Sequence, residues 1–404
     1  MKIALLHYTF GPVVGGVETV LEQHAALFAA NGHEVTVICG EGEDPNPAIN
    51  VTVIPEMRRD HPIATAAQEE LDGGAAGADF AELKKRLVDA LSACFDNCDI
   101  VFFHNVLTMH FHLALTAALW ELAGRPGGAR FMAWIHDLAA ANPDYPFPQI
   151  EREPWNLLTR RHPHVEYVAV SAHRRKQFAS LTGAPSECCR VIPNGIDPIA
   201  QLDLTENVAK LAGERAILEK DVVLLHPARI LKRKNIELGM RVAAEFKMAG
   251  KTCCCIVTGA PDRHNADATD YHDLLLKLRA ELGLADEFIF LHELFAVTNR
   301  DMIGLYRIAD ALFFPSKQEG FGLPILEGGL HRVPIFCADI EPMKSHGQQH
   351  ITWFSPEIAP GALAGTILKQ FAASPAIQAR KTAVREYSWK RIYLSYLEPL
   401  LDGK

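Results

Sequence analysis

The sequence lacks any apolar run long enough to cross a membrane. Across its 404 residues, no hydrophobic stretch approaches the roughly 20 residues that a transmembrane helix needs. The apolar run at residues 1–6 is also too short for the core of a signal peptide, and residues 2–7 are interpreted as a first β-strand. We therefore expect no transmembrane segment and a cytoplasmic protein.

The chain also lacks a surplus of basic residues. Its 40 Lys and Arg stand against 49 Asp and Glu, which gives a formal net charge of −9. Binding of nucleic acid needs a net basic face that neutralises phosphates, so no nucleic-acid partner is expected. The same balance argues, more weakly, against tight docking on anionic membranes.

Paired cysteine motifs are missing as well. The nine cysteines are odd in number and include neighbours, Cys188-Cys189 and Cys253-Cys254-Cys255. No two CxxC motifs offer the spacing of a zinc site, so we interpret the cysteines as reduced thiols packed in a core. Several histidines lie close together without carboxylate partners, and packing is favoured over a metal site for His104, His110 and His112.

Short apolar runs alternate with longer helical patterns along the whole chain. The 49% hydrophobic content is that of an ordinary globular protein, and the length suggests two or three domains of about 150 residues. Unbroken Val, Ile, Leu, Phe and Cys runs are typical of parallel strands buried on both faces. Strands are predicted at 2–7, 35–39, 100–104, 130–135, 166–170, 222–226, 252–258, 287–291, 311–314 and 334–337. The alternation predicts a doubly wound α/β fold with parallel sheets.

A boundary between two similar halves is predicted at residues 191–198. Two prolines flank an Asn-Gly turn there, and the strand–helix pattern then starts again. The halves 1–194 and 198–385 are each expected to be Rossmann-like, and an amphipathic helix is expected over 388–401. A stretch rich in Ala, Gly and acidic residues, 64–79, predicts a mobile surface loop.

Two loops that follow predicted strands have the composition of anion sites. Residues 11–18 form a glycine-rich turn, with Gly15 and Gly16 opening a helix whose free N–H groups favour anions. The turn is not GxGxxG, which disfavours a dinucleotide, and a mere tight turn is an equal alternative.

Residues 229–235 follow the first strand of the second half, where ligands bind in doubly wound sheets. The cations Arg229 and Lys234 suit a diphosphate, and a solvated basic loop is the alternative.

The strongest signal is the segment 315–327, which carries two carboxylates eight residues apart. It leaves a strand, passes two glycines and enters a helix, with Glu319 in the loop and Glu327 about one turn into the helix. Carboxylates are natural acceptors for sugar hydroxyls, and the amides around Phe321 and Gly322 suit oxygen atoms. For either glutamate alone, a surface carboxylate is the alternative.

Together these residues resemble a known enzyme family. Glu319 and Glu327, with the Glu-Gly-Phe-Gly-Leu-Pro lead, resemble the E-x7-E motif of retaining glycosyltransferases of family 4. That family has the GT-B fold, in which two Rossmann-like domains face each other across a cleft. Arg229 and Lys234 resemble the family's diphosphate-binding pair. Further segments fall in the family's order at 15–18, 136–137, 192–197 and 388–390. The last of these resembles the start of a final helix, so 388–404 is expected to complete the domain 1–194.

The resemblance implies a role for each site residue. Arg229 and Lys234 would stabilise the leaving diphosphate, Glu319 would hold hydroxyls of the transferred sugar, and Glu327 would hold the ribose. His136 would approach the sugar from the acceptor side. Further contacts with the donor are expected at Gly15, Gly16, Glu293, Leu294, Phe321, Gly322 and Leu323.

The reaction implied is transfer of a hexose from a UDP- or GDP-sugar to an acceptor hydroxyl, without a metal or another cofactor. Fixed cations stabilise the charge that develops on a departing diphosphate. The sequence shows no obvious second acidic residue opposite Glu319 to serve as a nucleophile; Asp137 is conceivable but stands beside His136 in a loop of the first half. Front-face transfer is therefore favoured, as the resemblance implies. The donor is assigned to 198–385, whereas a small-molecule, glycan or lipid-linked acceptor is assigned to 1–194.

Some positions depart from the family pattern and leave the donor open. They are His292, residues 328–332 and residues 340–347. Three other functions stay open on the same fold, namely a sugar-nucleotide epimerase, a glycosyl phosphorylase and a non-catalytic protein that binds nucleotide-sugars.

Overall fold

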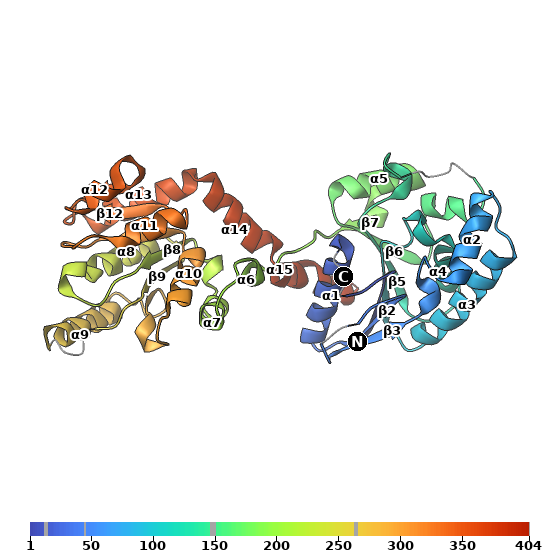
Figure 1. Ribbon diagram of the computed structural model, residues 1–404, viewed down its shortest axis with the longest axis horizontal. Coiled ribbons are helices and arrows are strands. Elements are labelled where there is room, and N and C mark those ends of the chain that lie inside the picture. Colours follow the sequence, from blue (N-terminus) through green and yellow to red (C-terminus); the bar gives the residue numbers. More distant parts are fainter. Residues whose placement is uncertain (12–14, 44–45, 146–150, 262–265, 404) are drawn as a thin grey trace. The chain divides into compact units, whose positions relative to one another are not determined.

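The computed structural model describes the chain except for residues 12–14, 44–45, 146–150, 262–265 and 404 (Figure 1). The chain divides into two compact units. Unit 1 contains Met1–Gly195 together with Trp389–Lys404, and unit 2 contains Ile196–Ser388. Each unit is built on one sheet whose strands pair in parallel.

The sheet of unit 1 has seven strands in the order β3-β2-β1-β4-β5-β6-β7. Their bounds are β1 Lys2–Leu6, β2 Glu34–Cys39, β3 Ile49–Val53, β4 Ile100–His104, β5 Arg130–Ile135, β6 Val165–Ala169 and β7 Cys189–Val191. The order runs outward from β1 in both directions, so the strand order reverses between β1 and β4. In a doubly wound sheet this is the position where ligands bind, at the carboxyl ends of the strands.

Helices cover both faces of this sheet. One face packs on α2 Pro62–Asp72, α3 Ala78–Phe95, α4 Leu113–Ala123 and α5 Ala172–Thr182. The other face packs on α1 Gly16–Ala30 and on the C-terminal segment, which contains α15 Trp389–Ile392, a π-helical turn Tyr393–Leu397 and α16 Glu398–Leu401. The red C-terminal segment therefore lies beside the blue α1 in Figure 1.

The sheet of unit 2 has six strands in the order β10-β9-β8-β11-β12-β13. Their bounds are β8 Val222–His226, β9 Cys253–Val257, β10 Phe288–Phe290, β11 Ala311–Phe314, β12 Ile335–Ala338 and β13 Thr352–Phe354. The order reverses between β8 and β11, so the loops that leave these two strands meet at the ligand-binding position of the fold.

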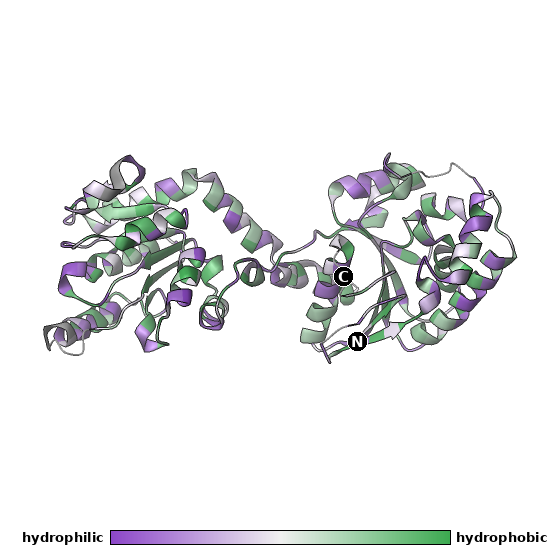
Figure 2. Cartoon of the chain, viewed as in Figure 1, coloured by the Kyte–Doolittle hydropathy of each residue, from purple (hydrophilic) through white to green (hydrophobic). Residues whose placement is uncertain are grey.

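The helices of unit 2 also form two layers. One layer contains α8 Ile236–Met248, α9 Ala266–Glu281 and α13 Pro360–Ala373. The other contains α7 Glu206–Glu214, α10 Asn299–Ile308, α11 Leu323–Leu330, α12 Met343–Gly347 and part of α14 Pro375–Tyr387, and α6 Pro198–Gln201 opens the unit. The strands between the layers are buried and largely hydrophobic (Figure 2).

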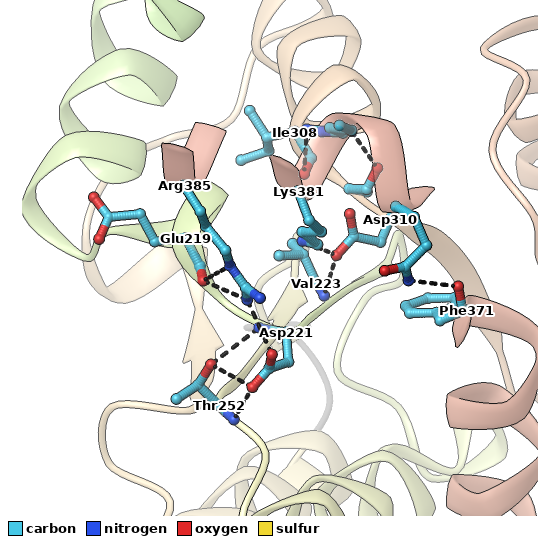
Figure 3. Close-up of polar contacts among 12 residues, drawn as sticks. Glu219, Asp221, Val223, Thr252, Ile308, Asp310, Phe371, Lys381 and Arg385 are labelled. Atoms are coloured by element: carbon cyan, nitrogen blue, oxygen red, sulfur yellow. Dashed lines mark hydrogen bonds and ion pairs between the residues drawn. The ribbon is translucent and has the colours of Figure 1, made fainter. Parts of the chain in front are cut away.

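Helix α14 is attached to the sheet of unit 2 by polar contacts (Figure 3). Lys381 Nζ lies 2.6 Å from Asp310 Oδ2, and the same oxygen accepts a hydrogen bond from the Val223 backbone N–H at 2.9 Å. Arg385 Nη2 donates to the Glu219 carbonyl at 2.8 Å and pairs with Asp221 at 3.0 Å. The first group connects α14 to β8 through Asp310, and the second connects α14 to the residues just before β8.

The doubly wound α/β fold predicted from the sequence is confirmed. All ten predicted strands form, with ends that differ by a residue or two. Three short strands at or near the sheet edges were not predicted, β3, β7 and β13. The predicted loop over 64–79 is wrong, because α2 and the start of α3 occupy most of it. Its alanines are strong helix formers, and Ala64, Ala67 and Leu71 pack on the core as one helical face.

Candidate functional site

The loops after β8 and β11 are joined by hydrogen bonds in unit 2. The Lys317 N–H donates to the Arg233 carbonyl at 2.8 Å, and Arg233 Nη1 donates to the Gln318 carbonyl at 2.9 Å. Asn235 Nδ2 donates to the Pro315 carbonyl at 3.1 Å. Asn235 has a φ of 53°, in the left-handed region that asparagine adopts more readily than most residues. The two loops therefore hold each other at the point where the strand order reverses.

Lys234 and Glu319 form an ion pair between these loops. Their side chains are only 11% and 8% exposed. Arg233 Nη1 lies 3.5 Å from the second oxygen of Glu319, and Lys234 Nζ lies 5.5 Å from the centroid of the Phe314 ring. The sequence assigned Lys234 to a diphosphate and Glu319 to a sugar, and the structure places the two side chains in contact with each other.

Arg229 lies at the start of the same loop and is exposed. Its backbone packs against Gly259, where an added Cβ would collide with the Arg229 Cα and the Ala228 carbonyl. The Ile230 N–H donates to the Ala260 carbonyl at 3.3 Å. Arg229 forms no ion pair with any described residue. Its backbone is fixed, and its guanidinium is uncompensated in the same loop that contains Lys234.

Glu327 lies in α11 and accepts a hydrogen bond from the Tyr306 hydroxyl at 2.8 Å. The Tyr306 ring is stacked on His331, with centroids 4.9 Å apart and an interplanar angle of 4°. Burial and, next, the carboxylate of Glu327 raise the pKa of Tyr306, so its hydroxyl keeps its proton and donates. Glu327 is thereby oriented by a neighbour on α10.

Gly322 is the residue before α11 and has a φ of 91°, which favours glycine. An added Cβ would also collide with the Met343 sulfur. The side chains on either side of it, Phe321 and Leu323, are exposed. The loop thus presents two apolar side chains at the start of α11, where Pro324 has no N–H and the Ile325 N–H donates to the Gly322 carbonyl at 3.0 Å.

Glu293 and Leu294 follow β10, where contacts to the nucleobase were predicted. Both oxygens of Glu293 pair with Arg279, at 2.9 Å and 3.2 Å. The Arg279 guanidinium lies 5.3 Å from the centroid of Phe290. Leu294 is exposed. The Glu293 side chain is therefore engaged within unit 2.

A cavity of about 620 Å³ in unit 1 is lined by Gly16, Glu18 and His136 among others. Gly15 precedes α1 in extended conformation, and an added Cβ there would collide with the Glu18 carboxylate. The Glu18 side chain also accepts a hydrogen bond from the Thr9 hydroxyl at 2.7 Å. Residues 12–14 of the predicted glycine-rich turn lie outside the described residues.

His136 is held at this cavity by its backbone. The N–H groups of His136 and Asp137 both donate to Asn105 Oδ1, at 3.2 Å and 2.8 Å. Burial and, next, the nearby His7 lower the pKa of His136 to about 3, so the imidazole is neutral at pH 7. His7 lies 3.7 Å from Glu18, and this approach with the Thr9 hydrogen bond lowers the pKa of Glu18 to about 2. The cavity therefore contains a neutral imidazole and an ionised carboxylate.

Several residues that orient the predicted site were missed in the sequence. Arg233 and Asn235 lie inside the basic run, which is a signal for them, but their contacts with the β11 loop depend on the fold. Tyr306 and Asn105 carry no signal in the sequence, since each lies far along the chain from the residue it holds. Hydrogen bonds between distant elements decide their roles.

Among the residues that the structure describes, no group of three or more His, Cys, Asp and Glu side chains is placed to hold a metal ion. In the same described part of the chain, no helix combines the length and the apolar character needed to span a bilayer.

Residues 14–199 match the family model described as Glycosyltransferase Family 4, and residues 208–378 match Glycosyl transferases group 1. A D-inositol 3-phosphate glycosyltransferase from Nocardia farcinica is 27% identical over 175 residues, which are 43% of this chain and 37% of that protein. A mannosylglucosylglycerate synthase from Thermotoga maritima is 23% identical over 85% of this chain and 82% of its own length. A structure of HepE from Anabaena in complex with UDP is 20% identical and covers 100% of both chains, with a TM-score of 0.38.

Proposed function

Because the chain belongs to the glycosyltransferases of family 4 and group 1 and has their GT-B fold, we propose that it is a retaining hexosyltransferase. A hexose passes from a nucleoside-diphosphate sugar, with UDP or GDP as the nucleotide, to a hydroxyl of the acceptor. The Thermotoga relative is named for a mannosylated product, and this name supports a hexose as the transferred sugar.

The observation that carries this proposal is the group of charged residues at the reversal point of the unit 2 sheet. Arg229 presents an uncompensated cation, and Lys234 is a second cation whose partner is the carboxylate of Glu319. A donor supplies the matching groups, since its diphosphate is an anion and its sugar carries hydroxyls. On binding, Lys234 exchanges Glu319 for the diphosphate, and Glu319 exchanges Lys234 for sugar hydroxyls. The pair keeps both charges compensated before the donor binds.

The proposed transfer needs no metal or other cofactor. Negative charge develops on the diphosphate as the bond from the anomeric carbon to the phosphate oxygen breaks, and Arg229 and Lys234 stabilise that charge. The acceptor oxygen forms its bond on the same face of the sugar, and its proton passes to the departing phosphate. His136 acts here as a neutral hydrogen-bonding group, because its pKa of about 3 keeps it uncharged at pH 7.

The proposal is tested by the configuration of the product. Purified protein is incubated with a panel of UDP- and GDP-hexoses, and candidate donors are first found by thermal shift, since a ligand that binds the folded state raises its stability. We expect a product with the anomeric configuration of the donor, at a rate unchanged by EDTA. An inverted product contradicts the retaining reaction, a rate abolished by EDTA contradicts metal independence, and failure of every nucleoside diphosphate to bind contradicts the function itself.

A further inference from the structure

A second cavity of about 550 Å³ adjoins the cavity of His136 in unit 1. The two cavities share four residues of their linings, namely Tyr8, Thr9, Arg59 and Phe111. These shared residues come from the end of β1 and from segments that follow β3 and β4. They form a wall that the two cavities share, here called the shared wall.

Arg59 in this wall is a cation without a carboxylate partner among the described residues. Its guanidinium lies 4.9 Å from the centroid of the Phe111 ring. The adjacent Arg58 forms ion pairs with the nearby carboxylates, with Asp60 at 2.7 Å and with Glu41 at 3.3 Å. Of two neighbouring arginines, one is neutralised by its surroundings and the other is held against an aromatic ring with its charge uncompensated.

The histidines beside Arg59 add no charge of their own at neutral pH. Burial lowers the pKa of both His110 and His112, and the nearby Arg59 lowers each a little further. The positive charge of this wall is therefore that of Arg59.

Tyr8 provides the second group of the wall. The residue is only 8% exposed, and its hydroxyl has no hydrogen-bond partner among the described residues. Buried hydroxyls in proteins are almost always paired, so an unpaired hydroxyl on a residue that lines both cavities points to a ligand atom. Burial raises the pKa of Tyr8, so the hydroxyl keeps its proton and can donate.

We propose that Arg59 and Tyr8 form an anion subsite for the acceptor. The acceptor is then a hydroxyl compound that also carries a negatively charged oxyacid group, either a phosphate or a carboxylate. The planar guanidinium of Arg59 binds two oxygens of that group, and the Tyr8 hydroxyl donates to one of them. This inference rests on the proposed transfer reaction, because it names the class of acceptor.

The second cavity is also lined by the carboxylates of Glu41, Asp60, Glu69 and Asp72, of which the first two pair with Arg58, so an anion is favoured at the shared wall and not deeper in that cavity. At the wall, the charges of Glu18 and Arg59 orient such an acceptor. Glu18 in the first cavity is ionised, since its pKa is about 2, and it repels an anion while it accepts hydrogen bonds from hydroxyls. Arg59 attracts the anion at the shared wall. The charged end of the acceptor therefore lies at Arg59, and its hydroxyl end lies beside Glu18 and His136.

The first test measures binding of three matched probes, namely glycerol 3-phosphate, glycerate and glycerol, by saturation-transfer NMR. The tested variants are Arg59→Gln and Tyr8→Phe. The control is Arg152→Gln, because Arg152 also lies over an aromatic ring, 5.6 Å from Trp155, and lines neither cavity. We expect one charged probe to bind at least tenfold more tightly than glycerol, and Arg59→Gln to remove most of that advantage. Tyr8→Phe should weaken the charged probe severalfold, and Arg152→Gln should change it less than twofold.

The charged probe that binds more tightly identifies the oxyacid group as phosphate or carboxylate. Equal binding of all three probes overturns the inference. Binding that depends on Arg229 but not on Arg59, measured with Arg229→Gln, also overturns it, because the anion then belongs to unit 2.

The second test separates this inference from the transfer function itself. Affinity for UDP and GDP is measured by calorimetry in wild type and Arg59→Gln. We expect equal nucleotide affinities and, with the charged acceptor, a KM raised at least tenfold in the variant with little change in kcat. A protein that binds no nucleotide contradicts the proposed function and leaves the probe titration intact. A protein that transfers to a neutral acceptor equally well with and without Arg59 contradicts only the anion subsite.

Discussion

At the residue scale, Glu319 and Glu327 are the same side chain in two different surroundings. Glu319 is nearly buried against Lys234, whereas Glu327 is exposed and accepts from Tyr306. If Glu327 binds the ribose, Glu327→Ala should weaken binding of the free nucleoside diphosphate by about tenfold to a hundredfold, which corresponds to roughly 1.5–3 kcal/mol. Glu319→Ala should leave that affinity nearly unchanged, because its partner hydroxyls are absent from the product and Lys234 becomes free for the diphosphate. Calorimetry with the bare nucleotide measures both, and equal losses would show that the assigned roles are wrong.

Arg229 offers the cleaner test of diphosphate stabilisation, since replacing Lys234 would leave Glu319 nearly buried without its main partner. Arg229→Ala should lower kcat by about two orders of magnitude or more, the loss typical of removing one group that stabilises developing charge. Lys232→Ala is the matched control, because Lys232 is an exposed cation of the same loop. Steady-state kinetics should show less than a threefold change for the control. A similarly small change for Arg229→Ala would mean that the basic loop is only a solvated surface.

Buried histidines give the protein a pH dependence whose sign follows from their pKa values. Burial lowers the pKa of His24 and of His226 to about 3, from an ordinary 6.5. The unfolded chain then binds protons below about pH 6.5 that the folded chain does not bind, so stability falls as the pH falls from 6.5 toward 3. Each such histidine adds a slope of about 1.4 kcal/mol per pH unit.

His24 is the residue with which to measure this slope. Neither of its ring nitrogens has a hydrogen-bond partner in the described structure, and its ring packs edge-on against Trp134 and Trp389. His24→Phe should therefore lose less stability than wild type between pH 7 and pH 5, by about 1–2 kcal/mol. Urea unfolding at the two pH values provides the comparison. An unchanged difference would mean that His24 is not neutral in the folded state.

At the element scale, one of the contacts that attach α14 is a buried ion pair. Lys381 and Asp310 are 6% and 3% exposed, and burial lowers the pKa of Lys381. Lys381→Met should destabilise unit 2 by about 3–5 kcal/mol, because it leaves the Asp310 charge buried without its ion-pair partner, with only the Val223 N–H still donating to it. Arg385→Met removes a more exposed ion pair of the same helix and should cost less, since exposed pairs contribute only about 0–1 kcal/mol. Urea unfolding of the two variants tests the difference, and equal costs would contradict it.

The elements that were predicted correctly are those whose own residues are apolar enough to show that the element is buried. The central strands of both sheets are continuous apolar runs, and these were found within a residue or two. The missed strands β3, β7 and β13 are three to five residues long, and their existence depends on pairing with a neighbour. The helix α2 was missed for a related reason, because its small alanines become a core face only when α3 packs on them.

The same distinction applies to the site. Arg229, Lys234, Glu319 and Glu327 could be selected from residue type and position after a strand, because parallel strands bring their carboxyl ends to one edge. Their partners could not, since the Tyr306–Glu327 and Asn105–His136 contacts join elements whose distance in space is set by the whole sheet order. Residue type and position therefore select candidate site residues in the sequence, whereas the groups that orient them become visible only in the fold.

At the scale of the whole molecule, the end of the chain belongs to the unit in which the chain begins. Trp389, Ile392, Tyr393 and Leu397 are buried in the same core cluster as Leu21 and Phe28 of α1. Gly195 at the end of unit 1 packs against Trp389 so closely that an added Cβ would overlap the indole ring. Residues that follow unit 2 in the sequence therefore complete the core of unit 1.

Truncation after Ser388 should consequently destabilise unit 1 and spare unit 2. Loss of the C-terminal segment exposes the α1 face of the sheet, and burial of each large apolar side chain is worth about 1.5–3 kcal/mol. Hydrogen exchange should show faster exchange in α1 and β1 of the truncated chain, with protection in α8 and β8 unchanged. Gly195→Ala is a milder version in the full-length chain and should shift the same elements of unit 1 by a smaller amount, because the Cβ displaces the Trp389 ring. Equal loss of protection in both units would show that unit 2 also depends on the segment after Ser388.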